Sequence, residues 1–317
     1  MNATLPAQPV DLVQDSREVL STHARSFRWA GAFLPRAQLD DAAVVYAFCR
    51  LVDDLADEAP DRETARVDLT LLRDELTGEQ PARPLVARTR EVLVRGGQGT
   101  GPALHLIAGV LTDLDPVRLH DDGALHTYAY QVAGTVGLMM CAVLGVSDPE
   151  AWPFAVDLGV GMQITNICRD VREDAARGRT YLPAHRLRAV GLPPQRLIEA
   201  ATTGPDLTAS ERQRLARIVD DLLAEADRYY ASAEAGMRFI PWRARLAIRV
   251  ASRVYRAIGV RLRRRGSDAW AGRTIVGIGG KIAWTLAALA AHVQPRRPAV
   301  HQQDLHQNLR DLPGCQA

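Results

Sequence analysis

Two pairs of aspartates with the same spacing are the residues in this chain best suited to chemistry. Asp53 and Asp57 lie four positions apart in the segment DDLAD, and Asp170 and Asp174 repeat that spacing in RDVRED. On a helix, residues four apart share one face, where two carboxylates repel unless a cation lies between them. Magnesium prefers oxygen ligands and completes its shell with water and substrate phosphates. Each pair is therefore a candidate half-site for a metal-bound diphosphate.

The second pair belongs to a longer polar stripe. Gln163, Asn166, Asp170 and Asp174 are spaced three, four and four positions apart in a segment that we interpret as one helix. Burying such a stripe costs free energy unless it binds something. Arg169 lies beside the stripe and can donate charge-assisted hydrogen bonds to phosphate. One aspartate pair alone is common on surface helices, but two pairs predict helices that face each other around magnesium and diphosphate.

The elements that must position these residues are predicted to be helices. Apolar residues recur at helical spacing along most of the chain, and segments rich in proline and glycine separate the helical stretches. We expect about ten helices and no substantial sheet. The segment YAYQVAGTVGLMM carries small residues at Ala133, Gly134 and Gly137. They indicate either close helix packing or room for a prenyl chain along an apolar tunnel.

Composition and charge narrow the classes of partner. The chain has 317 residues, of which 47% are hydrophobic, and its formal net charge of +2 is too small to indicate a nucleic-acid partner. Eleven arginines nevertheless fall between Arg238 and Arg273, against the single acid Asp268. Such a stripe is consistent with phosphates, with an anionic membrane surface or with a solvated helix face.

Cysteine spacing and terminal composition suggest a compartment and a domain division. The four cysteines form no C-x-x-C pair, and no signal peptide is recognised, so a reducing cytoplasm is expected rather than a disulfide framework or a cysteine zinc site. Residues 275–293 are interpreted as a core helix, with a shallow membrane contact as the alternative. Residues 1–293 are predicted to form one helical domain, followed by a flexible polar tail over residues 294–317.

Taken in order, the motifs resemble the squalene/phytoene synthase family. The resemblance rests on HARSF, FLP, YAFCRLVDDLAD, YAYQVAGTVGLMM and QITNICRDVREDAARGRTYLP, and it spans roughly Ser16 to Lys281. It implies an all-α fold, an isoprenoid-synthase-type helical bundle with a central apolar cavity. It also implies that both aspartate motifs bind magnesium diphosphate at the cavity mouth, with manganese as an alternative ion.

The resemblance implies a role for each residue that matches a family motif. The implied metal ligands are Asp53, Asp57, Asn166, Asp170 and Asp174. The implied catalytic residues are the four aspartates and Tyr128, which is the candidate for steering charge or protons. The implied substrate-binding residues are Ser26, Phe27, Tyr46, Arg50, Val132, Ala133, Gly137, Gln163, Asn166, Arg169, Tyr255 and Arg273.

The implied reaction joins two prenyl diphosphates head to head through a cyclopropyl diphosphate. The favoured substrate is geranylgeranyl diphosphate, giving phytoene without NADPH as the first step of carotenoid biosynthesis. The alternative is farnesyl diphosphate, giving squalene, presqualene diphosphate or dehydrosqualene. Other classes considered are a terpene cyclase, a non-catalytic assembly factor and a membrane-binding structural protein, but the paired aspartate motifs disfavour them. Peripheral contact with the inner face of an anionic membrane and a downstream desaturase as partner are further expectations.

Overall fold

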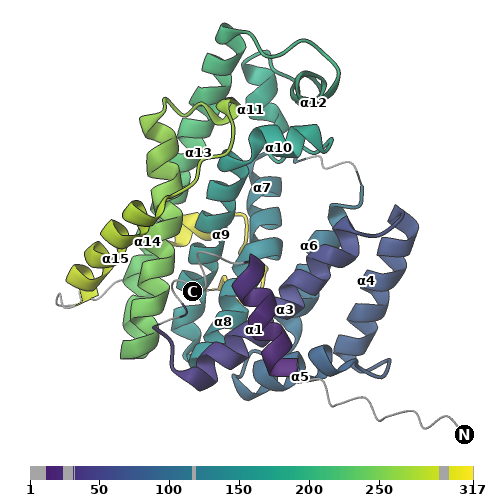
Figure 1. The fold of residues 1–317 in the computed structure, drawn as a ribbon, viewed down its shortest axis with the longest axis vertical. Helices are drawn as coiled ribbons and strands as arrows, with labels where there is room; N and C mark the ends of the chain where they lie inside the picture. The colour runs from purple at the N-terminus through teal and green to yellow at the C-terminus, as the bar shows by residue number, and fades with distance from the viewer. Residues whose placement is uncertain (1–11, 24–30, 32, 116–118, 293–299, 317) are drawn as a thin grey trace, which may run out of the picture.

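The computed structural model describes residues 12–23, 31, 33–115, 119–292 and 300–316, with only the backbone described for residues 19–23. Helices and connecting loops make up these residues, and no strand occurs among them. Figure 1 shows the helices gathered into one bundle. The prediction of an all-α fold is therefore confirmed.

The described α-helices follow one another along the chain. Their bounds are α1 (Leu12–His23), α3 (Arg36–Asp57), α4 (Arg62–Thr77), α5 (Pro84–Arg95), α6 (Gly101–Thr112), α7 (Asp122–Ala129), α8 (Thr135–Leu144), α9 (Trp152–Arg169), α10 (Val171–Ala176), α11 (Ala184–Ala189), α12 (Pro194–Thr202), α13 (Ala209–Gly236), α14 (Trp242–Arg264) and α15 (Ile278–His292). Short helical turns of other types are η1 (Tyr130–Gly134), η2 (Pro149–Ala151), η3 (Met237–Phe239), η4 (Ala269–Ala271) and η5 (Gln303–His306).

Helix α9 lies at the centre of the bundle and contacts α7, α8, α13 and α14. Small residues allow this close packing. A Cβ atom added to Gly137 on α8 would lie 2.1 Å from the Ala155 carbonyl oxygen, and one added to Gly159 would lie 2.1 Å from the Ala133 carbonyl oxygen. The space beside Ala133 and Gly137 is therefore filled by α9. Of the two readings of this segment, the structure supports close helix packing.

Helix α7, η1 and α8 form one helical run from Asp122 to Leu144. Its middle, Tyr130–Gly134, is a π-helical turn, a local widening that is frequent at functional sites. Among the described residues this run is the one helix long and apolar enough to cross a membrane, yet 61% of its most apolar window is buried. Its apolar composition is thus explained by its place in the core.

The core has two main parts. One surrounds α9 and α13 and includes Ile164 and Leu222, and the other surrounds α3, α4, α5 and α6 and includes Phe48 and Leu69. Val132 and Trp152 are partly buried and pack against both parts. The ends of α3 and α9 that carry the aspartate motifs therefore rest on separate packed groups of helices.

Many arginines of the predicted stripe make internal contacts rather than forming a free basic face. Arg245 and Arg249 on α14 are buried. Arg256 donates to Asp227 on α13 over 2.6 Å, and Arg263 donates to the same carboxylate over 2.5 Å. Three arginines of α14, Arg249, Arg256 and Arg263, thus balance acids of α13.

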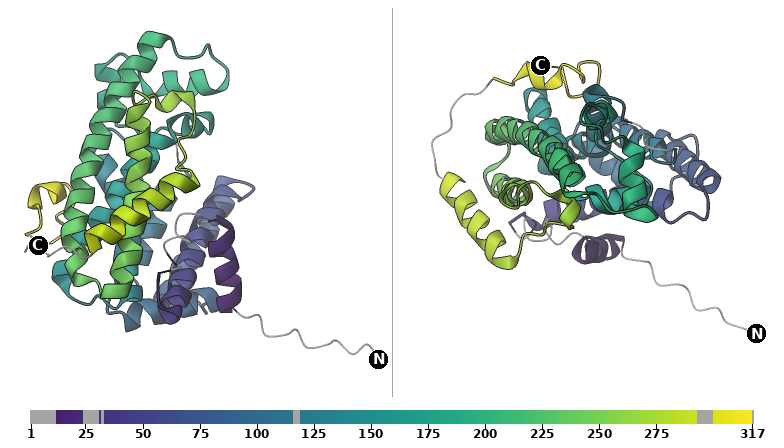
Figure 2. Two further views of the ribbon diagram at one scale, coloured as in Figure 1. Left: turned by 60° about the vertical axis from the view of Figure 1, so that its left-hand side comes forward. Right: turned by 90° about the horizontal axis from the view of Figure 1, so that it is seen from above.

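Helix α15 differs from the core helix that the sequence suggested. Ala288 and His292 are buried where α15 packs along α14, whereas the opposite face is apolar and open to solvent. The exposed fractions are 72% for Ile278, 46% for Ile282, 60% for Leu286 and 40% for Leu289. Figure 2 shows α15 running along the outside of the bundle.

Residues 300–316 also differ from expectation, because they pack against the bundle rather than forming a flexible tail. Leu305, Leu309 and Cys315 are buried in the core around α9 and α13. Tyr229 donates to the Leu305 carbonyl over 2.9 Å, and Tyr130 donates to the Pro313 carbonyl over 2.9 Å. The segment is polar in composition, and Val300 at its start is exposed, but its three leucines and Cys315 reach the core.

Candidate active site

A pocket of about 320 Å³ opens between the C-terminal ends of α3 and α9. Its lining is rich in charged side chains from segments far apart in the sequence. The lining residues are Asp53, Ala56, Asp57, Val110, Asp113, Tyr128, Gln163, Asn166, Ile167, Arg169, Asp170, Asp174, Arg177, Arg179 and Tyr181. Both predicted aspartate pairs therefore line one pocket.

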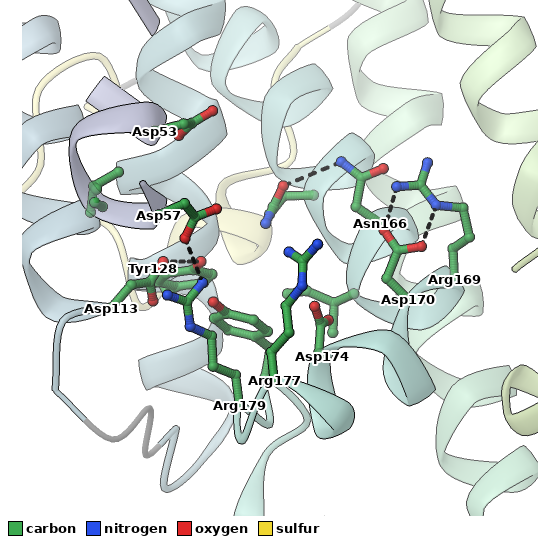
Figure 3. A pocket seen from close by; sticks show the side chains of 15 residues that line it. Asp53, Asp57, Asp113, Tyr128, Asn166, Arg169, Asp170, Asp174, Arg177 and Arg179 are labelled. Atoms are coloured by element: carbon green, nitrogen blue, oxygen red, sulfur yellow. Dashed lines mark hydrogen bonds and ion pairs between the residues drawn. The ribbon is translucent and has the colours of Figure 1, made fainter. Parts of the chain in front are cut away.

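The first aspartate pair lies on the last turn of α3. Figure 3 shows Asp53 and Asp57 on one side of the pocket, opposite the residues of α9 and α10. Asp57 Oδ1 accepts a hydrogen bond from Arg179 Nη1 over 3.0 Å. Asp53 also lines the pocket, where surrounding protein and then the charge of Asp57 raise its pKa to about 7, against the opposing effect of Arg50.

The second aspartate pair lies where the helix path is interrupted. Helix α9 ends at Arg169 and α10 begins at Val171, so Asp170 joins two helices rather than lying inside one. The predicted single helix is wrong at this residue, but the spacing survives because the Asp174 amide still donates to the Asp170 carbonyl over 2.8 Å. Burial and the neighbouring Asp170 raise the pKa of Asp174 to about 7.

Arginines surround the second pair. Arg169 donates two hydrogen bonds to the Asp170 carboxylate, one from Nε over 2.7 Å and one from Nη2. Arg273 Nε lies 3.2 Å from Asp170 Oδ1. Arg177 and Arg179 also line the pocket, and Figure 3 shows them rising between the two aspartate pairs. The site therefore combines cationic and anionic groups, which suits an anion held together with a cation.

Asn166 and Gln163, about one and two turns before Asp170, face the same pocket. Asn166 Nδ2 lies 3.4 Å from Gln163 Oε1. The Asn166 Oδ1 atom is buried and finds no hydrogen-bond partner within the described part of the chain. A buried, unpaired oxygen is costly, so this atom is a free ligand position directed at the pocket.

A tyrosine pair and a carboxylate form another wall of the pocket. The Tyr128 hydroxyl donates to Asp113 Oδ2 over 2.8 Å, and the rings of Tyr128 and Tyr181 stack with centroids 4.9 Å apart. Burial raises the pKa of Asp113 to about 6, although the bond from Tyr128 opposes that shift. A carboxyl group with this pKa changes its protonation state near neutral pH, and Tyr128 is its hydrogen-bond partner.

The remaining predicted site residues fall into four groups. Arg50 lies on α3 beside the pocket, where it forms an ion pair with Asp54 at 2.5 Å. Burial raises the pKa values of Tyr46 and Tyr255, which lie near each other. The charges of Arg169 and Arg273 oppose the shift in the pKa of Tyr255. Val132, Ala133 and Gly137 do not line the pocket. Ser26 and Phe27 lie outside the described residues.

Sequence reasoning did not single out four polar residues of the pocket lining. They are Asp113, Arg177, Arg179 and Tyr181. Three of them follow the second aspartate motif within DAARGRTYLP, so proximity in sequence was a usable signal. Asp113 follows the end of α6 and has no such signal, because folding alone brings it to Tyr128.

The residues present fit a magnesium ion. The donors are carboxylate oxygens and the unpaired amide oxygen of Asn166, which are the ligand types that magnesium prefers. Asp53 and Asp174 have raised pKa values partly because other carboxylates crowd them. A divalent cation would relieve that repulsion and hold both groups ionised.

Comparison with known proteins gives the class to which this fold and pocket belong. The family model described as squalene/phytoene synthase matches residues 20–285. The chain belongs to the squalene/phytoene synthase family, whose members are prenyltransferase-type enzymes. The resemblance seen in the motifs is thereby confirmed.

Individual relatives span most of the chain. A 15-cis-phytoene synthase from a Paracoccus species is 35% identical over 299 residues, covering 87% of this chain and 92% of the relative. A presqualene diphosphate synthase from Rhodopseudomonas palustris is 32% identical over 263 residues, covering 81% and 90%. A crystal structure of a dehydrosqualene synthase with a ligand superposes with a TM-score of 0.76 at 26% identity, covering 88% and 96%. The bundle is therefore an isoprenoid-synthase fold.

Proposed function

We propose that this protein is a magnesium-dependent phytoene synthase. It joins two geranylgeranyl diphosphates head to head through a cyclopropyl diphosphate, and releases phytoene. The observation that carries the proposal is the single pocket in which Asp53 and Asp57 face Asp170 and Asp174, with arginines between them. Two carboxylate pairs on opposite walls can bind two diphosphate groups through cations.

The pocket residues have distinct parts in this chemistry. Magnesium, when bound, supplies the positive charge that turns diphosphate into a leaving group. Arg177 and Arg179 line the pocket, where they can contact phosphate oxygens and stabilise the charge that develops as diphosphate departs. Asn166 contributes its unpaired Oδ1 atom as a metal ligand. The four aspartates hold the cations in place.

The carbon chemistry needs proton acceptors but no reductant. Loss of the first diphosphate gives an allylic cation, which the second substrate's double bond attacks, and loss of a proton closes the cyclopropane ring. Loss of the second diphosphate triggers rearrangement, and loss of another proton gives phytoene. The Tyr128–Asp113 pair lies in the pocket wall and is our candidate for accepting a proton or guiding it to diphosphate.

We choose geranylgeranyl diphosphate, the C20 substrate, because of the names of the relatives. Several of the curated relatives that cover most of the chain carry the name phytoene synthase. A specific alternative remains, because the relative from Rhodopseudomonas palustris is named a presqualene diphosphate synthase and the superposed structure is a dehydrosqualene synthase. Under that alternative the substrate is farnesyl diphosphate, and NADPH is needed only if squalene is the product.

Product analysis tests the proposal. Purified protein is incubated with geranylgeranyl diphosphate and magnesium, without NADPH, and extracts are resolved by chromatography with mass detection. We expect phytoene from the wild type and none from Asp53→Ala. A C30 product from farnesyl diphosphate, with no C40 product in the parallel tube, would move the assignment to the alternative. Omitting magnesium or replacing it with manganese tests the ion.

We also propose that the enzyme works at a membrane surface. The proposed substrates carry long apolar chains and the product is a hydrocarbon, so a bilayer is a suitable source and acceptor. The exposed apolar face of α15 offers a contact for it. A cytoplasmic protein that binds the inner face of the membrane, within reach of a downstream desaturase, fits these features.

A further inference from the structure

A buried cluster near the N-terminal end of α9 has the ligands of a transition-metal site. Asp157 on α9 is fully buried, and His301 and His306 of the C-terminal segment are also buried. One ligand atom from each of these residues lies within 4.8 Å of the others. Asp157 precedes the polar stripe of the active site on the same helix, and none of the three residues lines the active-site pocket.

The hydrogen bonds in the cluster already orient the ligand atoms. His306 Nε2 lies 2.8 Å from Asp157 Oδ1, and His301 Nε2 lies 2.9 Å from Asp157 Oδ2. Ser232 donates to Asp157 Oδ2 over 2.5 Å. Both Nε2 atoms therefore point at the same carboxylate, as they would point at an ion bound beside it.

The second nitrogen of His306 is held as in a metal site. His306 Nδ1 lies 3.2 Å from the carbonyl oxygen of Cys315. Because carbonyl and carboxylate oxygens only accept, both nitrogens of His306 donate in the metal-free protein, and a zinc ion would replace the proton on Nε2. Metal-binding histidines commonly donate their other N–H group to a backbone carbonyl or carboxylate, which fixes ring orientation and tautomer.

In the part of the chain that the structure describes, His301 has no contact that fixes its second ring nitrogen. Its Nδ1 atom is buried and has no hydrogen-bond partner among the described residues. A pocket of about 320 Å³ borders the cluster and is lined by His301, Gln303, His306, Arg310, Cys315 and Gln316. The pocket gives solvent a route to the cluster and leaves room for a water molecule as a further ligand.

We propose that Asp157, His301 and His306 form a zinc site that fastens the C-terminal segment to α9. Two imidazoles and one carboxylate are typical zinc ligands, and a water molecule completes the tetrahedron. With zinc–ligand bonds of about 2.0–2.1 Å, the ligand atoms of a tetrahedral site lie about 3.3 Å apart. The distances from the two Nε2 atoms to the Asp157 oxygens must therefore lengthen by about half an ångström when zinc binds. Imidazole ligands favour zinc over magnesium, which separates this site from the all-oxygen donors of the active-site pocket.

Cobalt is a spectroscopic probe that distinguishes the two sites. Untagged full-length protein is freed of metal with a chelator and titrated with Co²⁺. Tetrahedral Co²⁺ with histidine ligands absorbs visible light strongly, whereas six-coordinate Co²⁺ among carboxylates absorbs weakly. We expect one equivalent of strongly absorbing Co²⁺ that Zn²⁺ displaces. Weak bands alone, or no binding, would overturn the proposal, and this result needs no variant.

Matched variants locate the site. The double variant His301→Gln/His306→Gln removes both imidazoles, and His120→Gln, at an exposed histidine outside both pockets, is the control. Loss of a single outer-shell partner weakens metal binding ~10–100-fold, so we expect at least ~10-fold weaker zinc binding in the double variant. Zinc should raise Tm for the wild type and the control but not for the double variant. Unchanged zinc affinity in a folded double variant would refute the site.

Discussion

At the residue scale, burial and neighbouring carboxylates make it costly for the pocket aspartates to ionise without a cation. The pKa of Asp174 is raised from 3.8 to about 7 by burial and by Asp170. Between the unfolded value of 3.8 and the folded value of about 7, the folded protein keeps a proton on Asp174 that the unfolded chain has released. Raising the pH from about 4 to about 7 therefore lowers the stability of the metal-free fold through this group, with no further loss above about 7.

This linkage predicts a pH-dependent difference between the wild type and Asp174→Asn. In the presence of chelator, Tm of the wild type should fall relative to Tm of the variant as pH rises from about 5 to about 7, because asparagine does not ionise. Adding magnesium at about pH 8 should raise Tm of the wild type more than that of the variant. Thermal unfolding at matched ionic strength measures both. Parallel pH profiles for the two proteins would contradict the account.

The pair formed by Asp113 and Tyr128 gives a second prediction at this scale. Asp113→Asn keeps the size of the side chain and a hydrogen-bond acceptor for Tyr128, but removes the charge. We expect kcat to fall by ~10²-fold, the lower end of what a positioned proton acceptor contributes, with the far-UV spectrum unchanged. In the wild type, kcat should also decline as pH falls through about 6, where Asp113 takes up a proton.

The control for this prediction is Asp115→Asn. Asp115 lies two positions further along and is paired with Arg66 outside the pocket. Its substitution should leave kcat within about twofold, as expected for a surface ion pair that contributes little. An Asp113→Asn enzyme as active as this control would remove Asp113 from the chemistry and leave it a structural partner of Tyr128.

The comparison of sequence with structure is also clearest for single residues. Asp53 with Asp57, and Asp170 with Asp174, could be predicted because each pair follows from local helix geometry, which sequence spacing encodes. Asp113 could not be predicted, because its closeness to Tyr128 depends on how α6 packs beside η1, which continues the helix that carries Tyr128. Arg273 was matched by family resemblance alone, and the fold brings it to 3.2 Å from Asp170.

At the element scale, the contact between α8 and α9 is fixed by glycine. Gly137→Ala should lower the free energy of unfolding by ~1–3 kcal/mol, because its Cβ atom would lie 2.1 Å from the Ala155 carbonyl oxygen and the helices must separate. Gly101→Ala, at the start of α6, has no atom within 4 Å of the added Cβ and should be neutral or stabilise by up to ~1 kcal/mol. Denaturant unfolding of both variants checks the prediction, and equal effects would contradict it.

The same glycine shows where element-level prediction stops. The spacing of Ala133, Gly134 and Gly137 is compatible with a tunnel and with helix packing, because both need small side chains on one face. Only the position of α9 decides, and it places Ala155 against Gly137. In the same way, amphipathic spacing correctly indicated helices before and after Asp170, but it could not show the interruption between α9 and α10.

At the scale of the whole molecule, the sequence was least informative about the C-terminal part. A polar, proline-containing composition is typical of flexible tails, and the few residues that anchor residues 300–316 are too sparse to form a periodic pattern. Their partners, Tyr229, Tyr130 and Asp157, come from three separate helical elements. Composition averages over a segment, whereas docking depends on individual contacts that only the assembled bundle creates.

The outer face of α15 gives the prediction that concerns the molecule as a whole. Ile278 and Leu286 are exposed by 72% and 60%, and burying such side chains in a bilayer surface is favourable by roughly 1.5–3 kcal/mol each. The double variant Ile278→Glu/Leu286→Glu should therefore bind anionic vesicles at least ~10-fold more weakly in a flotation assay, with Tm nearly unchanged because neither side chain is part of the core.

The matched control is Val94→Glu, which adds a charge at an exposed apolar residue of α5. We expect it to float with vesicles like the wild type, since α5 lies away from α15 (Figure 1). High salt should weaken wild-type binding only partly, because apolar burial on α15 remains when charges are screened. Binding that salt abolishes completely, or that both variants retain equally, would mean that α15 is not the contact and that exposed arginines hold the protein at the surface.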